Sequence, residues 1–171
     1  MKTIMSWLMD PGDKAPKSTV WIRLMVGWVF FWEGVIKFVF VNQGVGRFTK
    51  IGIPMPEVLA PAIATLEIVG GLALIAGFLT RPFALLFIGE MIVAILTTKI
   101  SMFLGTSPLP LPPVPPQTGF WAVLHESRSD IAQLLCCLFL LLVGPGPLSL
   151  DAMKRSTPPE PEPPASRREE T

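Results

Sequence analysis

Four long apolar stretches limit what this sequence can fold into. They cover residues 19–41, 58–79, 82–104 and 131–148, and each is close to the roughly 20 residues that an α-helix needs to cross a bilayer. Charged residues make up only 16% of the sequence, whereas a soluble domain carries about a quarter. We therefore predict an all-α protein, built as a bundle of four transmembrane helices in contact with the lipid bilayer.

The connections between these spans differ in length and composition. Spans two and three are separated only by Thr80 and Arg81, so they are predicted to form an antiparallel hairpin. Residues 105–119 contain the run PLPLPPVPP, which favours a stiff polyproline II segment. The fourth span is expected to follow Ser129 and Asp130 as N-terminal caps. The Gly-Pro-Gly-Pro run at residues 144–147 is expected to break its last turn.

The two ends of the chain are predicted to lie outside the membrane domain. Residues 1–18 lack the cleavage site of a signal peptide, and a short interfacial helix with Trp7 at headgroup level fits them better. The mature chain is accordingly expected to begin at or next to Met1. Residues 152–171 are polar and proline-rich, so we expect a disordered tail. The four-helix membrane domain then covers residues 19–151.

The distribution of lysine and arginine predicts the orientation, because cytoplasmic loops carry an excess of these residues. With the N-terminus in the cytoplasm, eight such residues lie on that side and four on the other. Both termini are therefore expected to be cytoplasmic. The eight are Lys2, Lys14, Lys17, Arg81, Lys154, Arg155, Arg167 and Arg168, and the four are Arg47, Lys50, Lys99 and Arg128.

Six charged residues lie inside or at the boundary of the first three spans. A charged side chain at the centre of a membrane helix costs about 2.5–3.5 kcal/mol on insertion scales, so each needs a partner, a hydrogen bond or a wet cavity. The six are Arg23, Glu33, Lys37, Glu67, Arg81 and Glu90. We expect them to form an intramembrane polar cluster.

The spacing of these charges indicates where they point. In span one, the charges share a helix face with the small residues, at intervals of four and three. This face carries Arg23, Gly27, Phe30, Gly34 and Lys37, while Glu33 lies beside it and four residues before Lys37. Span two repeats the pattern with Glu67, Gly70, Gly71, Leu74, Gly77 and Arg81, and span three aligns Glu90 with Ala94, Thr97 and Ser101. Because small residues let membrane helices approach closely, the charged faces are predicted to converge.

Three interpretations of the charges remain open from the residues alone. They can hold the bundle together without any chemistry, form a site for a ligand or cofactor head group, or line a proton or ion pathway. A transporter ranks last, because the sequence shows no pair of discontinuous helices and no inverted repeat.

Several familiar chemistries lack their sequence signatures. The single histidine, His125, lies in a loop beside Glu126, with no Ser-His or Cys-His arrangement. Neither Glu67 nor Glu90 begins a Glu-x-x-His motif, so we expect no di-iron or other metal site. No haem-attachment motif or nucleotide-binding glycine loop appears, and no basic run suggests nucleic acid. The adjacent Cys136 and Cys137 are expected to be small core residues.

Four motifs in order resemble the DoxX family of small four-helix membrane proteins. They are R-x3-G-x2-F-x3-G-x2-K from Arg23, F-x3-G-x-P-x-P from Phe48, E-x2-G-G-x2-L-x2-G-x3-R from Glu67, and G-P-G-x2-S-L-D ending at Asp151. The resemblance covers most of the chain, from about Arg23 to Asp151. The proline-rich connection and the tail look like additions to the family pattern.

The resemblance implies a role in membrane redox chemistry. The family is named for a subunit associated with a terminal quinol oxidase and with thiosulfate:quinone oxidoreductase activity. Other relatives are linked to oxidant defence or act as assembly factors. The resemblance therefore implies a multi-pass accessory subunit of a quinone-linked complex in a cytoplasmic membrane of bacterial or archaeal type, beside other membrane subunits.

A quinone would suit such a bundle, because its carbonyl oxygens need hydrogen-bond donors and its ring needs an apolar slot. We expect donors among the charged residues of the cluster. The aromatic slot is expected from Trp28, Phe30, Phe31 and Trp32, with lipid contact as the alternative for Trp28 and for Trp21. No complete cofactor site is visible, so the chain is not expected to be an oxidoreductase on its own. A lipid head group is the other ligand expected for such a site. The alternatives to an accessory subunit of a redox complex are a purely structural or assembly subunit and, third, a small proton or ion transporter.

Overall fold

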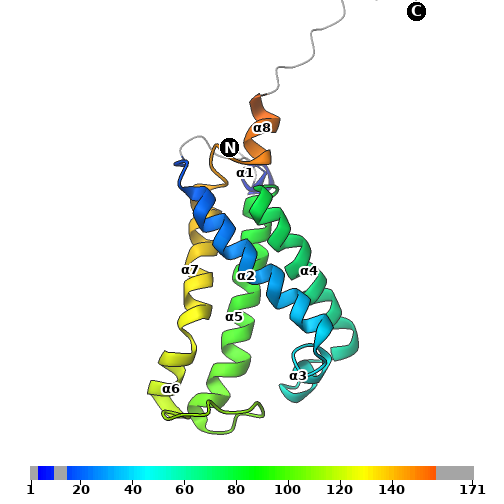
Figure 1. Ribbon diagram of the computed structural model, residues 1–171, viewed down its shortest axis with the longest axis vertical. Coiled ribbons are helices and arrows are strands. Elements are labelled where there is room, and N and C mark those ends of the chain that lie inside the picture. The colour runs from blue at the N-terminus through cyan, green and yellow to red at the C-terminus, as the bar shows by residue number, and fades with distance from the viewer. Residues whose placement is uncertain (1–3, 10–14, 157–171) are drawn as a thin grey trace, which may run out of the picture.

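The computed structural model describes residues 4–9 and 15–156, and within these residues the chain is all-helical (Figure 1). Four helices are long: α2 (Thr19–Val39), α4 (Pro56–Ala76), α5 (Thr80–Leu104) and α7 (Arg128–Val143). Four are short: α1 (Ile4–Leu8), α3 (Val45–Lys50), α6 (Gly119–Glu126) and α8 (Leu150–Ser156). The all-α prediction is confirmed for the described part of the chain.

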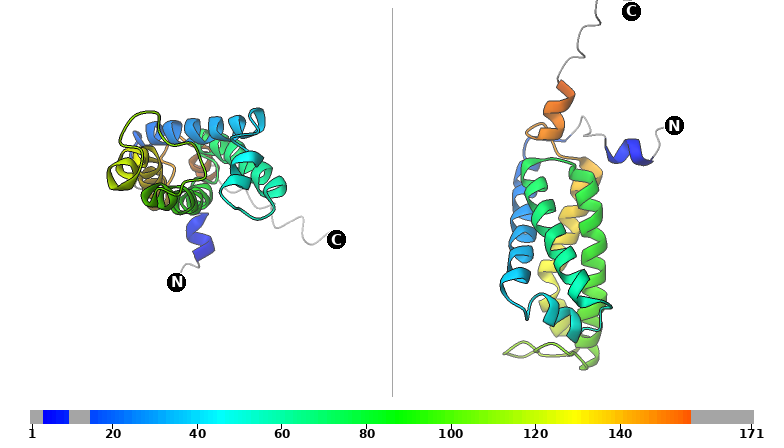
Figure 2. Two further views of the ribbon diagram at one scale, coloured as in Figure 1. Left: turned by 90° about the horizontal axis from the view of Figure 1, so that it is seen from below. Right: turned by 90° about the vertical axis from the view of Figure 1, so that its right-hand side faces the viewer.

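The four long helices run along the long axis, each antiparallel to the next (Figure 1). Seen end-on, they follow one another around the bundle in the order α2, α4, α5, α7 (Figure 2). Helix α2 packs chiefly on α4, and α5 packs chiefly on α7. Helices α3 and α6 lie at one end of the bundle, and α1 and α8 lie at the other (Figure 1).

Small residues set the distance between α2 and α4. A Cβ atom added to Gly27 would lie 2.5 Å from the carbonyl oxygen of Gly71, and one added to Gly34 would lie 2.6 Å from that of Ala64. The two backbones are therefore in direct contact, as small residues permit at membrane-helix interfaces. The face predicted from the spacing in span one is the face that α2 buries.

Aromatic stacking joins the two helix pairs across the centre. The rings of Phe30 on α2 and Phe87 on α5 are parallel within 4°, with centroids 3.7 Å apart. Gly70 on α4 makes room for this stack, because a Cβ there would lie 2.6 Å from the Phe87 ring. The buried cluster around these rings consists of Val26, Phe30, Leu74, Ala84, Phe87, Cys137 and Leu140.

Helices α2, α4 and α5 begin and end within three residues of the limits predicted for the first three apolar stretches, but α7 differs from the prediction. Helix α7 ends at Val143, five residues early, because Gly144 leaves the helical conformation and Pro145 and Pro147 cannot continue it. Ser129 and Asp130 lie inside its first turn and are not its caps, and Ser127 precedes the helix without a side-chain capping bond. Helix α6, directly before α7, was not predicted because its residues continue no long apolar run.

Among the described residues, α4 and α5 are long and apolar enough to cross a membrane. Helix α2 has the same length as α4 but carries three charged residues, and α7 has only 16 residues. At the chain ends, α1 includes Trp7, and α8 takes residues 152–156 of the segment predicted to be disordered. Residues 157–171 of that segment, together with 1–3 and 10–14, lie outside the described residues.

The α2–α4 contact leads to a paired prediction. Changing Gly27 to Ala forces a methyl group against the Gly71 carbonyl, and such overpacking costs about 1–3 kcal/mol. The matched change Gly89→Ala on α5 meets no atom within 4 Å and removes the helix penalty of glycine, roughly 0.5–1 kcal/mol. Thermal unfolding in mild detergent should show a lower midpoint for Gly27→Ala and an unchanged or higher one for Gly89→Ala. Equal unfolding midpoints for the two variants would contradict the close contact between α2 and α4 at Gly27.

Candidate functional site

Four of the six charged residues singled out in the sequence come together inside the bundle. The ammonium nitrogen of Lys37 lies 2.6 Å from Glu67 Oε1 and 3.7 Å from Glu33 Oε2. Glu90, on α5, lies beside Glu67 and lines the same cavity. We call Glu33, Lys37, Glu67 and Glu90 the carboxylate–lysine cluster.

Local geometry explains why Lys37 finds these partners. Glu33 and Lys37 are one turn apart on α2, in the order that favours an ion pair. Glu67 reaches the same ammonium group from α4 because Gly34 allows the helices to touch, and a Cβ at Gly34 would lie 3.0 Å from Glu67 Cβ. The Glu67 side chain is only 2% exposed, whereas that of Glu33 is 58% exposed. The buried core of the cluster is therefore the Lys37–Glu67 pair with Glu90.

A cavity of about 630 Å³ lies beside the cluster, within the size range of small-molecule pockets. Its wall comes from the C-terminal half of α2, from α3, from the N-terminal half of α4, and from α5 and the start of α7, so it occupies the α3 end of the bundle. Most of the wall is apolar. The polar residues at the wall are Glu33, Lys37, Gln43, Arg47, Glu67, Glu90, Thr97, Thr98, Ser129, Asp130 and Gln133.

Glu67 and Glu90 share a side-chain hydrogen bond, but within the described residues three buried side-chain oxygens at this wall accept none from an amide, ammonium or hydroxyl group. They are Glu67 Oε2, Glu90 Oε2 and Gln133 Oε1. Buried polar atoms in folded proteins nearly always have a partner, so such atoms in a cavity call for an explanation. Gln133 was missed in the sequence because it is uncharged and stands alone in the apolar run of span four. The one sequence feature that could have identified Gln133 was a polar side chain within an apolar stretch.

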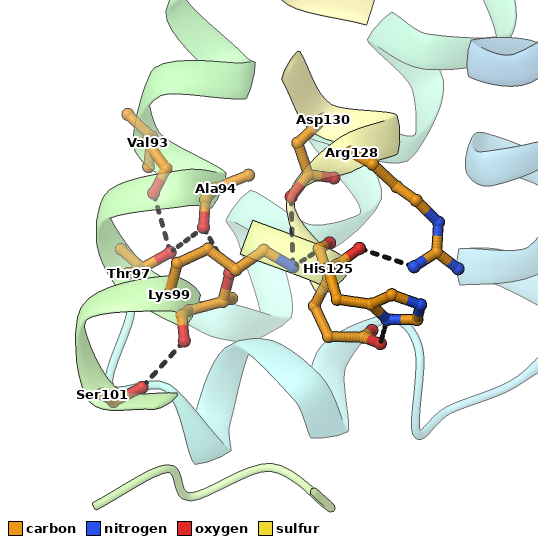
Figure 3. Close-up of polar contacts among 10 residues, drawn as sticks. Val93, Ala94, Thr97, Lys99, Ser101, His125, Arg128 and Asp130 are labelled. Atoms are coloured by element: carbon orange, nitrogen blue, oxygen red, sulfur yellow. Dashed lines mark hydrogen bonds and ion pairs between the residues drawn. The ribbon is translucent and has the colours of Figure 1, made fainter. Parts of the chain in front are cut away.

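A second ion pair closes the α3 end of the bundle. The Lys99 ammonium group lies 3.1 Å from Asp130 Oδ2 and donates to the carbonyl oxygen of Glu126 at 2.9 Å, which ties the end of α5 to the start of α7 (Figure 3). Nearby, Arg128 donates to the backbone of His125, and His125 lies 3.1 Å from the Glu126 carboxylate (Figure 3). His125 is 62% exposed and does not line the cavity.

The structure does not bring Arg23 to the cluster. Arg23 and Lys37 share a helix face, but 14 residues of α2 separate them by about 21 Å. The Arg23 guanidinium donates to the carbonyl oxygens of Pro145 and Leu148 at 2.7 Å, and to that of Ile75 at 3.4 Å. It thus ties the turn after α7 to α2 and α4.

Arg81 also lies away from the cluster, at the α1 end of the bundle. Its guanidinium donates to the carbonyl oxygens of Trp7 at 2.9 Å and Leu142 at 3.3 Å, and it lies 4.6 Å from the centre of the Trp7 ring. Close by, the carboxylate of Asp151 accepts hydrogen bonds from the backbone N–H groups of Leu79 and Thr80, and so caps α5. This end of the bundle is held together by side chains bonded to backbone.

The aromatic residues of α2 divide between the inside and the outside. Phe30 lines the cavity and is 1% exposed. Trp21, Trp28 and Trp32 are 70%, 60% and 43% exposed on the outer surface. Phe48 of α3, which was not singled out for this role, lines the cavity as well. The predicted slot of four aromatic residues is therefore reduced to Phe30 on α2.

The buried ion pair leads to a second prediction. Changing Lys37 to Met leaves Glu67 buried without its cation, which is expected to cost about 3–5 kcal/mol of stability. The double change Lys37→Met with Glu67→Leu removes both charges and should recover much of that loss. Glu33→Gln, on a side chain that is 58% exposed, serves as the control and should change stability little. The stability of the unchanged protein and of the three variants is measured by unfolding in detergent. If the double variant were as unstable as Lys37→Met, the ion pair between Lys37 and Glu67 would be contradicted.

Comparison with known proteins places this site in a family. The DoxX family model matches residues 18–100, which include all six charged residues predicted for the site. The chain is 40% identical to the "Uncharacterized membrane protein Rv3486" of Mycobacterium tuberculosis over 160 residues, which cover 89% of this chain and 91% of that protein. It is 33% identical to the "Putative oxidoreductase CatD" of Bacillus subtilis over 91 residues, 53% of this chain and 66% of that protein.

No solved structure matches the chain. The family match contains the first three of the four motifs found in the sequence, and the fourth, at residues 144–151, follows it. The chain is a membrane protein of the DoxX family.

Proposed function

We propose that this chain is an integral membrane accessory subunit of a quinone-linked redox complex, and that its cavity binds a quinone head group. The observation that carries the proposal is the cavity of about 630 Å³, whose apolar wall is interrupted by the Lys37–Glu67 pair and Glu90. A mostly apolar pocket with a few convergent polar groups is the usual form of a small-molecule site. The word oxidoreductase in the name of the Bacillus relative supports the redox part of the proposal.

The proposal includes a four-helix membrane topology. The outward faces of the long helices carry large apolar side chains, while Arg23, Lys37 and Glu67 face inward, which is the arrangement that lipid favours. Exposed examples on the four helices are Trp28, Val69, Leu72, Leu85, Ile92, Leu96, Leu135 and Leu142. Helix α7 is the shortest of the four, with 16 residues, which correspond to about 24 Å. A membrane helix shorter than the hydrocarbon core is accommodated by local thinning of the bilayer.

The lysine and arginine distribution supports cytoplasmic termini, in a cytoplasmic membrane of bacterial or archaeal type. Arg81 and Lys17 belong to the α1 end, and Arg47, Lys50, Lys99 and Arg128 belong to the α3 end. The remaining positive charges of the predicted cytoplasmic side lie near the chain termini.

Reporter fusions test this topology. A reporter that is active only in the cytoplasm should work when fused after the C-terminus, and alkaline phosphatase, active only outside, should work when inserted into the loop at residues 106–117. The reciprocal fusions serve as controls and should be inactive. If one reporter were active both in the loop and after the C-terminus, these two positions would lie on the same side of the membrane. That result would contradict a single crossing by α7.

A quinone ring fits the chemistry of the cavity wall. Its carbonyl oxygens accept hydrogen bonds, and Lys37, Arg47 and the Gln133 amide are donors at the wall. Phe30 and Met91 supply apolar surface for the ring. When bound, a quinone carries electrons and protons between redox partners, and the cofactor that exchanges electrons with it is proposed to belong to a partner subunit.

The alternative is a structural or assembly subunit, in which the charges only hold the helices together. A specific observation favours this alternative for part of the chain, because Arg23 and Arg81 bond to backbone carbonyl groups at helix ends. Their contacts organise the α1 end of the bundle and leave the cavity untouched. The two functions therefore differ in what the carboxylate–lysine cluster does.

The change Glu67→Gln separates the two functions. If the cluster binds quinone, the quinone-dependent turnover per intact complex should fall about tenfold or more, since one lost charge-assisted contact is worth at least that factor. The control Glu57→Gln, on an exposed residue of α4 outside the cavity, should leave turnover unchanged. Native gels, mass spectrometry and turnover assays provide the measurements. A dissociated complex or lower yield with normal turnover per complex would favour the structural role.

A further inference from the structure

The cavity has an apolar side, which lies between α4 and α5. These two helices are close together near their hairpin, where the rings of Phe83 and Phe87 lie against Gly70, and they diverge toward the α3 end (Figure 1). Between the diverging helices the cavity wall is apolar on both sides. The wall residues there are Leu59, Ile63 and Leu66 on α4, on the helix face that Gly70 turns to α5, and Leu86, Gly89 and Val93 on α5.

The α5 edge of this apolar side is not covered by another helix. Leu86 and Val93 line the cavity but are 50% and 53% exposed, and Gly89 is exposed as well. By the helical repeat, Gly89 lies between these two cavity residues and the exposed Leu85 and Ile92 of the outward face. A Cβ atom added to Gly89 would meet no atom within 4 Å. The cavity is therefore open to the outside of the bundle at Gly89.

Lipid lies outside this opening. Helices α4 and α5 are the two described helices that are long and apolar enough to cross a membrane, and Gly89 lies well inside α5, away from both of its ends. An opening at this depth adjoins the hydrocarbon chains of the bilayer. A polar molecule on that route would lose its water without gaining partners, whereas an apolar chain has no such cost.

The cavity thus offers two different surroundings to one ligand. On its inner side, the Lys37–Glu67 pair and Glu90 supply polar contacts. At the opening, the wall is apolar and continuous with lipid. This division fits a molecule with a polar head group and an apolar tail, with the head at the charged residues and the tail between α4 and α5.

We infer that the ligand of this cavity is an amphiphile with a long apolar tail, which enters from the bilayer between α4 and α5 and keeps its tail in this opening. Gly89 leaves the room for the tail, since a bulky side chain at this position would fill the opening. The inference rests on the proposed function for the head group. It adds the entry route and makes the tail a part of the ligand that the protein recognises.

Photolabelling of the full chain in lipid nanodiscs tests the position of the tail. The probe is a benzoquinone whose alkyl tail carries a diazirine close to the ring, and the control probe is the same tail without the ring. Mass spectrometry of the labelled peptides should place the quinone label on Leu59, Ile63, Leu66, Leu86 or Val93, and an excess of quinone without the diazirine should remove it. The control probe should label the outward faces of the long helices, without competition.

A substitution at the rim tests the opening itself. Gly89→Trp should weaken binding of the tail-bearing quinone about fivefold or more, the loss expected when a bulky group overpacks a site. Binding of the tailless benzoquinone should stay unchanged, because its ring lies at the inner side. The matched control Gly89→Ala adds one methyl group and should leave both affinities unchanged. Native mass spectrometry compares the probes at equal mole fraction in the nanodisc lipid, and circular dichroism shows that each variant is folded.

The outcomes distinguish this inference from the proposed function. If neither the tail-bearing nor the tailless quinone binds the unchanged protein, the proposed quinone site is wrong and the inference falls with it. If quinone binds but its tail labels α2 and α7, or the same residues as the control probe, the site stands and the route between α4 and α5 is overturned. The inference is also overturned if Gly89→Trp leaves both affinities unchanged or weakens both equally.

Discussion

The direct contact between the backbones of α2 and α4 is the constraint on which the site depends. At Gly27, Gly34 and Gly71 there is no room for a larger side chain, because the backbone of the facing helix is in contact. This contact brings Glu67 to 2.6 Å from the Lys37 ammonium group. A wider spacing would leave two charges buried without partners, which lipid does not tolerate. Helix packing and charge pairing therefore support each other in this pair of helices.

Helices α5 and α7, the second helix pair, complete the wall of the cavity around this ion pair. Helices α5 and α7 pack on each other and meet α2 through the Phe30–Phe87 stack. Toward the α3 end, the space between the pairs becomes the cavity, with Glu90 and Gln133 facing the Lys37–Glu67 pair from the other side. Toward the α1 end, Arg23, Arg81 and Asp151 bond to backbone groups. The bundle thus has a structural end and a cavity end.

The family motifs acquire a physical meaning in this arrangement. Gly77 lies so close to Arg23 and Ser149 that a side chain at Gly77 would displace them. Asp151, at the end of the last motif, caps α5 across the hairpin between spans two and three. Motif residues outside the cluster therefore pack helices together, either along the α2–α4 contact or at the helix ends, which explains why their pattern could be found without identifying a ligand.

Three features could be predicted from the residues alone: the all-helical class, the limits of three long helices within a few residues, and the helix faces that carry the charges. These features depend on local hydrophobicity and on the helical repeat, which neighbouring residues encode. The three-dimensional packing was needed to show that Lys37 meets Glu67 and Glu90 while Arg23 and Arg81 bind carbonyl groups elsewhere, and that Gln133 joins the cavity wall. Those partners lie tens of residues apart, or are backbone atoms common to all residues, so no local pattern specifies them.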